Sequence, residues 1–168
     1  KAALPLITSA LSDADPAVRR SAAGAIARIS GKDAAPFLIS YMKQFGDDED
    51  QKVAVDAYMS IAGNEEVNLL LPVLKEGPAA ARKSAILLMA WKQQGSHFSE
   101  ILPYASDADG SVRLSALRAL ESLAGPQDQG VLIKLLAATD NPVYVSILRQ
   151  ALTAAAGKIE DPEKRSLE

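Results

Sequence analysis

The sequence contains no cysteine and only one histidine among its 168 residues. Without cysteine the chain has no disulfide, no thiolate nucleophile and no cysteine-ligated zinc site. A single histidine excludes metal sites and proton relays that need several. No apolar run approaches the roughly 18 residues that a membrane-spanning helix needs, since the longest extends only over residues 85–91. We therefore predict no membrane partner, no metal and no cofactor, and the absence of cysteine leaves the compartment open.

Aromatic residues are also scarce, at 5% of the chain, whereas alanine occurs 30 times. So much alanine favours closely packed helices. The net charge of −3 provides no basic excess, which argues against nucleic acid or an acidic membrane as the partner. With 48% hydrophobic and 23% charged residues, the composition is that of a folded domain rather than a disordered segment.

The chain repeats itself. Residues 12–19 read SDADPAVR and residues 106–113 read SDADGSVR, and each stretch leads through apolar residues to a glycine. Weaker copies lie between and after these two. The aligned anchor positions recur on average every 31.5 or so residues, which is the size of a helix-pair repeat, and they are Val18, Val53, Ala81, Val112 and Tyr144.

Each anchor begins an apolar stripe at i, i+4, i+7 and i+8, which is one face of a helix. Proline stands near several predicted helix starts, and a glycine in the left-handed conformation is expected at each end, at Gly31, Gly63, Gly95, Gly125 and Gly157. A further helix precedes each anchored one. The predicted repeats are residues 2–31, 33–63, 65–95, 97–125 and 126–157, and residues 158–168 form a polar tail or open another repeat, with a tag scar at the end. We expect the sequence to be part of a longer chain.

The pattern Asp-x-x-x-x-Val-Arg, present at Asp13/Val18/Arg19 and at Asp107/Val112/Arg113, resembles HEAT repeats, and more narrowly the short bacterial HEAT-like repeats of phycobilisome lyases. The resemblance implies an all-α fold, a right-handed α-solenoid of about five HEAT-like helix pairs. It also implies that acids of the turns pair with arginines at the helix starts of neighbouring repeats. This structural ladder would comprise Asp13, Arg19, Asp48, Glu76, Arg82, Asp107 and Arg113.

Positions two and six residues after each anchor point away from the apolar stripe. Several hold apolar residues where a solvated helix would be polar, so we predict an interaction surface for another protein or a peptide. In the resembling family such second helices line the concave side, where partners bind. The candidate residues are Arg20, Val55, Met59, Lys83, Leu87, Trp91, Leu114 and Arg118. The alternative is that these side chains pack against neighbouring repeats.

No motif carries chemistry. An EF-hand starting at Asp107 would need glutamate where Arg118 stands. The acidic run 47–50 is expected to stay solvated, and His97 is expected at the surface or at a helix cap. Neither a nucleophile elbow nor a phosphate-binding loop occurs. We predict a non-enzymatic scaffold or protein-binding module. The alternative is an accessory subunit of an enzyme, such as a chromophore lyase, and a nucleic-acid-binding array is disfavoured because the exposed face offers few cations.

Overall fold

The computed structural model describes residues 4–91 and 97–158, and within these ranges the chain forms helices and no strand. The all-α class of HEAT-like helix hairpins is therefore confirmed. The chain divides into two compact units, residues 1–89 and 90–168. We call them the N-terminal and the C-terminal unit and describe each by itself, so the stacking of all the pairs into one right-handed solenoid stays a prediction.

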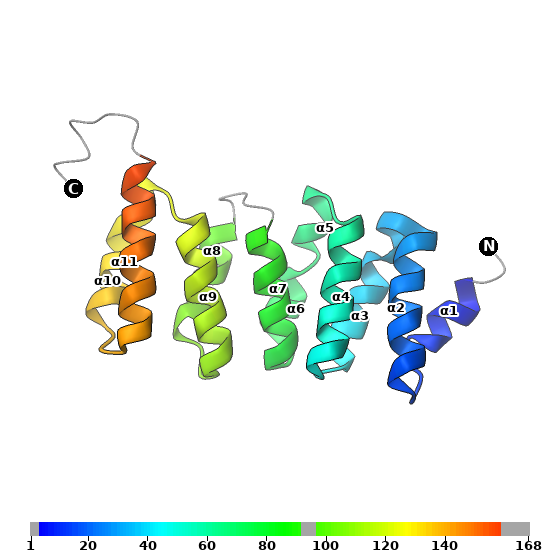
Figure 1. Ribbon diagram of the computed structural model, residues 1–168. Helices are drawn as coiled ribbons and strands as arrows, with labels where there is room; N and C mark the ends of the chain where they lie inside the picture. Colours follow the sequence, from blue (N-terminus) through cyan, green and yellow to red (C-terminus); the bar gives the residue numbers. More distant parts are fainter. Residues whose placement is uncertain (1–3, 92–96, 159–168) are drawn as a thin grey trace. The chain divides into compact units, whose positions relative to one another are not determined.

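In the N-terminal unit, short first helices alternate with longer second helices. Figure 1 shows the second helices α2 and α4 side by side, with α3 behind them. The helices are α1 (Leu4–Ala10), α2 (Pro16–Ser30), α3 (Ala35–Gln44), α4 (Asp48–Ile61), α5 (Asn64–Asn68), α6 (Leu71–Glu76) and α7 (Ala79–Trp91), with a short 3-10 helix, η1 (Gly31–Ala34), before α3. Helix α7 passes the unit boundary by two residues.

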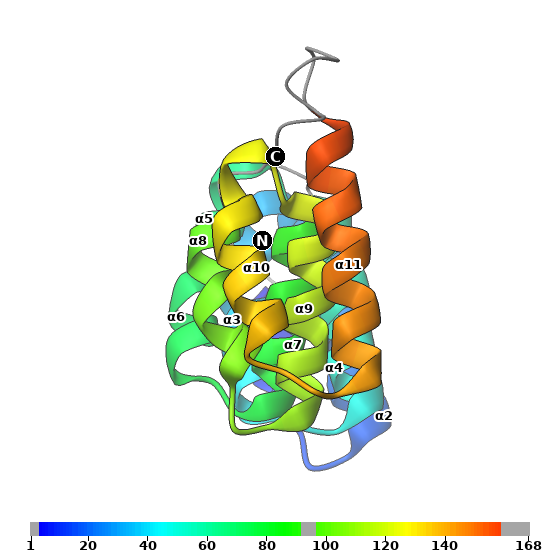
Figure 2. The same ribbon diagram turned by 90° about the vertical axis from the view of Figure 1, so that its left-hand side faces the viewer.

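The C-terminal unit contains two such hairpins. In Figure 2 its second helices, α9 and α11, lie in one layer, and α8 and α10 lie in the other. The elements are α8 (Phe98–Ile101), η3 (Leu102–Ser106), α9 (Gly110–Leu123), η4 (Pro126–Asp128), α10 (Gln129–Ala137) and α11 (Pro142–Gly157). The predicted tail, residues 158–168, lies outside the described part except for Lys158.

Four second helices begin at a side-chain cap. Asp15, Asp47, Asp109 and Asn141 each accept hydrogen bonds from backbone N–H groups of the first turn, at 2.8 to 3.3 Å. Such a cap satisfies donors that the helix itself leaves unpaired. The helix starts therefore follow from the sequence, and they also set the register of the repeats.

The predicted glycine ends are correct at only one of the described positions. Gly31, with φ of 54°, closes α2. Helices α4 and α9 instead end in an extended alanine, and the glycine that follows begins the next helix. The N–H of Gly63 donates to Glu66 at 2.6 Å and that of Gly125 to Asp128 at 2.8 Å. Gly157 is the last residue of α11, and Gly95 lies outside the described residues.

Two first helices are broken by proline. Pro72 lies in the first turn of α6, and Pro103 lies in the first turn of η3. Proline has no N–H to continue a preceding helix but is tolerated at the start of a new one. The third and fourth first helices are therefore each two short segments rather than one.

The buried stripe is confirmed over most of its length, but the register of one helix was wrong. The third residue after the cap is Val18 in α2, Val112 in α9 and Tyr144 in α11, and in α4 it is Asp50 rather than Val53. Val18 is also 41% exposed instead of buried.

Candidate functional site

A carboxylate with no solvent exposure lies inside the N-terminal unit. Asp50 accepts hydrogen bonds from Arg19, Arg20 and Tyr41, with closest distances of 2.6 Å to Arg19 Nη2, 2.8 Å to Arg20 Nε and 2.6 Å to the Tyr41 hydroxyl. The guanidinium of Arg19 also stacks 4.5 Å from the ring centre of Phe45. Three helices, α2, α3 and α4, thus contribute side chains to one buried cluster.

The partners keep this carboxylate ionised. Burial by itself would raise the pKa of Asp50, but hydrogen bonds from Arg19, Tyr41 and Arg20 outweigh it and lower the pKa to about 2. Burial, together with the neighbouring carboxylate, raises the pKa of Tyr41. An anion held by two guanidiniums and a phenol has no free lone pair for a substrate, so this cluster is structural. The expectation that the whole acidic run 47–50 stays solvated was wrong at Asp50.

The predicted ladder is only partly present. Arg19 pairs across the repeat with Asp50 and not with Asp48, which is exposed at the start of α4. Glu76 does pair with the preceding repeat, but with Lys43, at 3.2 Å. Of the remaining members, Asp13 and Asp107 accept the N–H of the residue two positions on, Arg113 reaches the Tyr144 hydroxyl, and Arg82 is half-buried on α7.

The candidate interaction residues differ widely in exposure. Val55 is buried, contrary to expectation, because it lies one turn from Gln51 on the side of α4 that faces Ser84 of α7. Arg20 is held in the Asp50 cluster. Of the others, Leu87, Trp91 and Arg118 are exposed, whereas Met59, Lys83 and Leu114 are half-buried.

Helix α7 therefore carries the clearest part of the predicted surface. Leu87 is 56% exposed and Trp91 is 43% exposed, and they lie one turn apart. Lys83 lies a further turn towards the start of the helix. The opposite side of α7 is buried and includes Ala85 and Met89. Ser84 borders the exposed side and donates to Gln51 at 2.7 Å. We call Lys83, Leu87 and Trp91 the α7 stripe.

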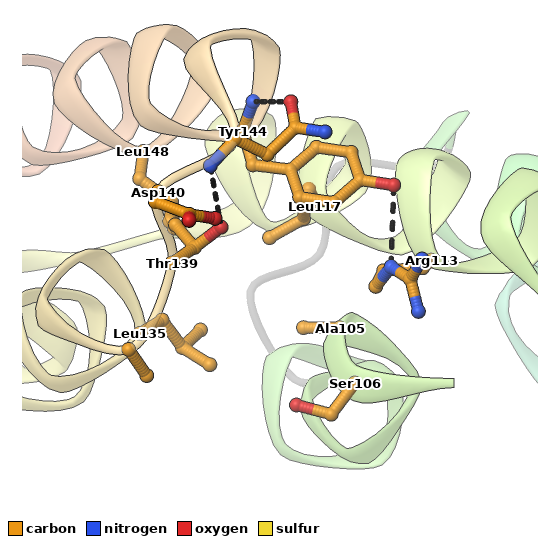
Figure 3. A pocket seen from close by; sticks show the side chains of 11 residues that line it. Ala105, Ser106, Arg113, Leu117, Leu135, Thr139, Asp140, Tyr144 and Leu148 are labelled. Carbon is orange, nitrogen blue, oxygen red and sulfur yellow. Dashed lines mark hydrogen bonds between the residues drawn. The ribbon is translucent and has the colours of Figure 1, made fainter. Parts of the chain in front are cut away.

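A groove that sequence analysis did not predict lies within the C-terminal unit (Figure 3). It has a volume of about 400 Å³ and runs between η3 and α9 on one side and α10 and α11 on the other. Arg113 and Tyr144 face each other across it, with 3.2 Å between Arg113 Nε and the Tyr144 hydroxyl (Figure 3). Its remaining lining is Ala105, Ser106, Leu117, Leu135, Ala138, Thr139, Asp140, Asn141 and Leu148. No motif in the sequence marks it.

The other sequence candidates do not form a site. His97 stands at the cap position of α8, but its side chain makes no capping hydrogen bond. It is buried, so the expectation of a surface residue was wrong. The described residues contain no group of three or more histidine, aspartate or glutamate side chains that could hold a metal ion. None of the described helices has the length and apolarity needed to cross a membrane.

Comparison with known proteins gives one family match. Residues 1–64 match the family model for HEAT repeats. No curated protein matches the chain. The matched range contains α1 to α4 and with them the whole Asp50 cluster.

Proposed function

Because residues 1–64 belong to the HEAT repeats, a family that generally mediates protein–protein interactions and scaffolding, we propose that this chain is a non-enzymatic module that binds another protein through the α7 stripe. The observation that carries the proposal is the exposure of Leu87 and Trp91 on a second helix whose other face is buried. Large apolar and aromatic side chains on one exposed face are typical of interface residues.

The composition of the stripe indicates the chemistry of the partner. Leu87 and Trp91 offer apolar area, and Lys83 adds a cation at one end. Apolar residues of a partner segment would bury Leu87 and Trp91, and an acidic residue next to them would pair with Lys83. Nucleic acid fits less well, because Arg20, one of the cations predicted on the outer face, already has its charge neutralised by Asp47 and Asp50.

Photo-crosslinking from a single position tests the proposal. A photoreactive phenylalanine replaces Leu87 in one variant and Ile133 in a matched control. Ile133 is 50% exposed but lies on α10, a first helix. After irradiation in an extract of the cells that make the protein, we expect one protein to be captured at position 87 and not at position 133.

A substitution then tests whether the captured protein depends on the stripe. Leu87→Asp places a charge in the proposed interface and should weaken binding of the captured protein at least about tenfold, whereas Ile133→Asp should leave it unchanged. Equal capture at both positions, or equal binding by both aspartate variants, would show that the α7 stripe is not the interface.

A further inference from the structure

Residues 11–61 and 105–155 form the same succession of helices, but the side chains between those helices differ. Every residue from 11 to 61 has a counterpart 94 positions further along, with no gap, so that the caps Asp15 and Asp47 correspond to Asp109 and Asn141. Arg19 then corresponds to Arg113. Both arginines contact the residue 31 positions ahead, which is Asp50 in the first case and Tyr144 in the second.

The groove of the C-terminal unit occupies the place of the Asp50 cluster. Its lining residues Leu135, Thr139 and Tyr144 correspond to Tyr41, Phe45 and Asp50. The two rings that pack around Arg19 are thus replaced by smaller side chains, and the carboxylate is replaced by a phenol. The ring of Tyr144 lies over Arg113, 5.4 Å from the guanidinium carbon, and the groove is open beside this pair along Leu135 and Thr139.

Arg113 also lacks the charge partner that Arg19 has. Its Nε donates to the Tyr144 hydroxyl at 3.2 Å and its Nη1 donates to the Asp107 carbonyl at 2.7 Å, and both acceptors are neutral. Within residues 97–158, the guanidinium forms no ion pair with a carboxylate. A half-buried guanidinium beside an open groove favours a carboxylate ligand, because charge-assisted hydrogen bonds are the stronger ones.

We propose that this groove binds an aspartate or glutamate side chain of a partner protein together with an adjacent aromatic residue. The carboxylate pairs with the Arg113 guanidinium beside the Tyr144 hydroxyl, and the ligand's ring fills the space over Leu135 and Leu148. Asp140 lies on the other side of the groove, away from Arg113 (Figure 3), so the ligand carboxylate binds at the arginine end. Only the choice of a protein as the source of the carboxylate rests on the proposed function.

Two blocked dipeptides that differ in one group provide the probe. N-acetyl-Phe-Asp-amide carries the ring and the carboxylate, and N-acetyl-Phe-Asn-amide has an amide in place of the carboxylate. In NMR titrations of the full chain, we expect saturable shifts of the Leu135 and Leu148 methyl signals, with the aspartate dipeptide binding at least about tenfold more tightly. Equal binding of the two would overturn the proposal. Tighter binding of N-acetyl-phenylalanine than of either would assign the groove to chain ends instead of side chains.

Variants locate the binding. Arg113→Gln should weaken the aspartate dipeptide about tenfold, whereas Arg149→Gln, which removes the same charge from an exposed position on α11, should not. The triple variant Leu135→Tyr, Thr139→Phe and Tyr144→Asp places the counterparts of Tyr41, Phe45 and Asp50 around Arg113. It should abolish binding while the chain keeps its helix content. Unchanged binding by the triple variant, or equal loss in both arginine variants, contradicts the proposal. Neither result bears on crosslinking from position 87, so the two proposals can fail separately.

Discussion

Asp50 is an anion at a helix position that is apolar in α2 and α9. The carboxylate can stay ionised in this buried place only because of the groups that bond to it. Removing the charge while keeping the shape isolates this dependence. In Asp50→Asn, Arg19 loses its carboxylate while Arg20 keeps Asp47, and breaking a buried ion pair from one side costs about 3 to 5 kcal/mol. We expect a loss of that size in the free energy of unfolding, measured by urea denaturation at pH 7.

The same substitution has a defined pH dependence. The pKa of Asp50 is about 2 in the folded chain against an ordinary 3.8, so the unfolded chain binds this proton first as the pH falls. The contribution of the carboxylate is therefore full above pH 4 or so and is lost as the pH drops towards 2. The difference between wild type and Asp50→Asn should shrink over that range, and Asp48→Asn, at an exposed carboxylate, should show little difference at either end. A gap that widens in acid would contradict this account.

At this scale the sequence predicts most buried apolar positions but not Asp50. Ala22, Ile26, Ala116 and Leu120 are buried as their spacing indicates. The apolar periodicity of the repeat favours Val53 as the anchor of α4 and does not indicate Asp50, the charged residue three positions earlier. Only the side chains of another repeat, Arg19 and Arg20, make that charge compatible with burial, and such pairing is not visible in local spacing.

Elements of the N-terminal unit are joined by one buried amide. Gln51 of α4 donates to the carbonyls of Met42 and Phe45 at the end of α3 and accepts from Ser84 of α7. We expect Gln51→Val, which copies Val145 at the corresponding position of α11, to lower the free energy of unfolding by about 3 kcal/mol, since it leaves buried polar groups unpaired.

A double-mutant cycle checks that this cost arises from the contact between helices. Ser84→Ala alone should cost about 1 kcal/mol, and in the Gln51→Val background it should cost clearly less, because its partner is already gone. Strictly additive losses, measured by the same denaturation, would show that α4 and α7 are not coupled through this pair.

Helix starts were more predictable than helix ends, and the reason is physical. A cap is a local bond between one side chain and the next turn, as at Asp15 and Asp109, so a short stretch of sequence determines it. An end depends on where the chain must go next. Gly63 and Gly125 stand where the sequence predicts helix ends. The N–H of each donates to a carboxylate three residues later, so each glycine begins the following helix instead.

At the scale of the whole molecule, the repeat length is evident in the sequence, because the copies at residues 12–19 and 106–113 are nearly identical. The groove was not predictable in the same way. It depends on which side chains stand at corresponding places: leucine, threonine and tyrosine line it where tyrosine, phenylalanine and aspartate stand 94 residues earlier. The spacing of the repeat is the same for both sets and does not distinguish them.

Repeat proteins draw their stability from interfaces between neighbouring repeats, so damage to one interface should remain local. We expect Asp50→Asn to accelerate amide hydrogen exchange in α2, α3 and α4 while α9, α10 and α11 keep their protection. Leu148→Ala, at a buried position of α11, removes about 3 kcal/mol of packing and should give the opposite pattern. If either substitution lowers protection by the same factor in all of these helices, the two units unfold as one cooperative body, and local interfaces do not set their stability.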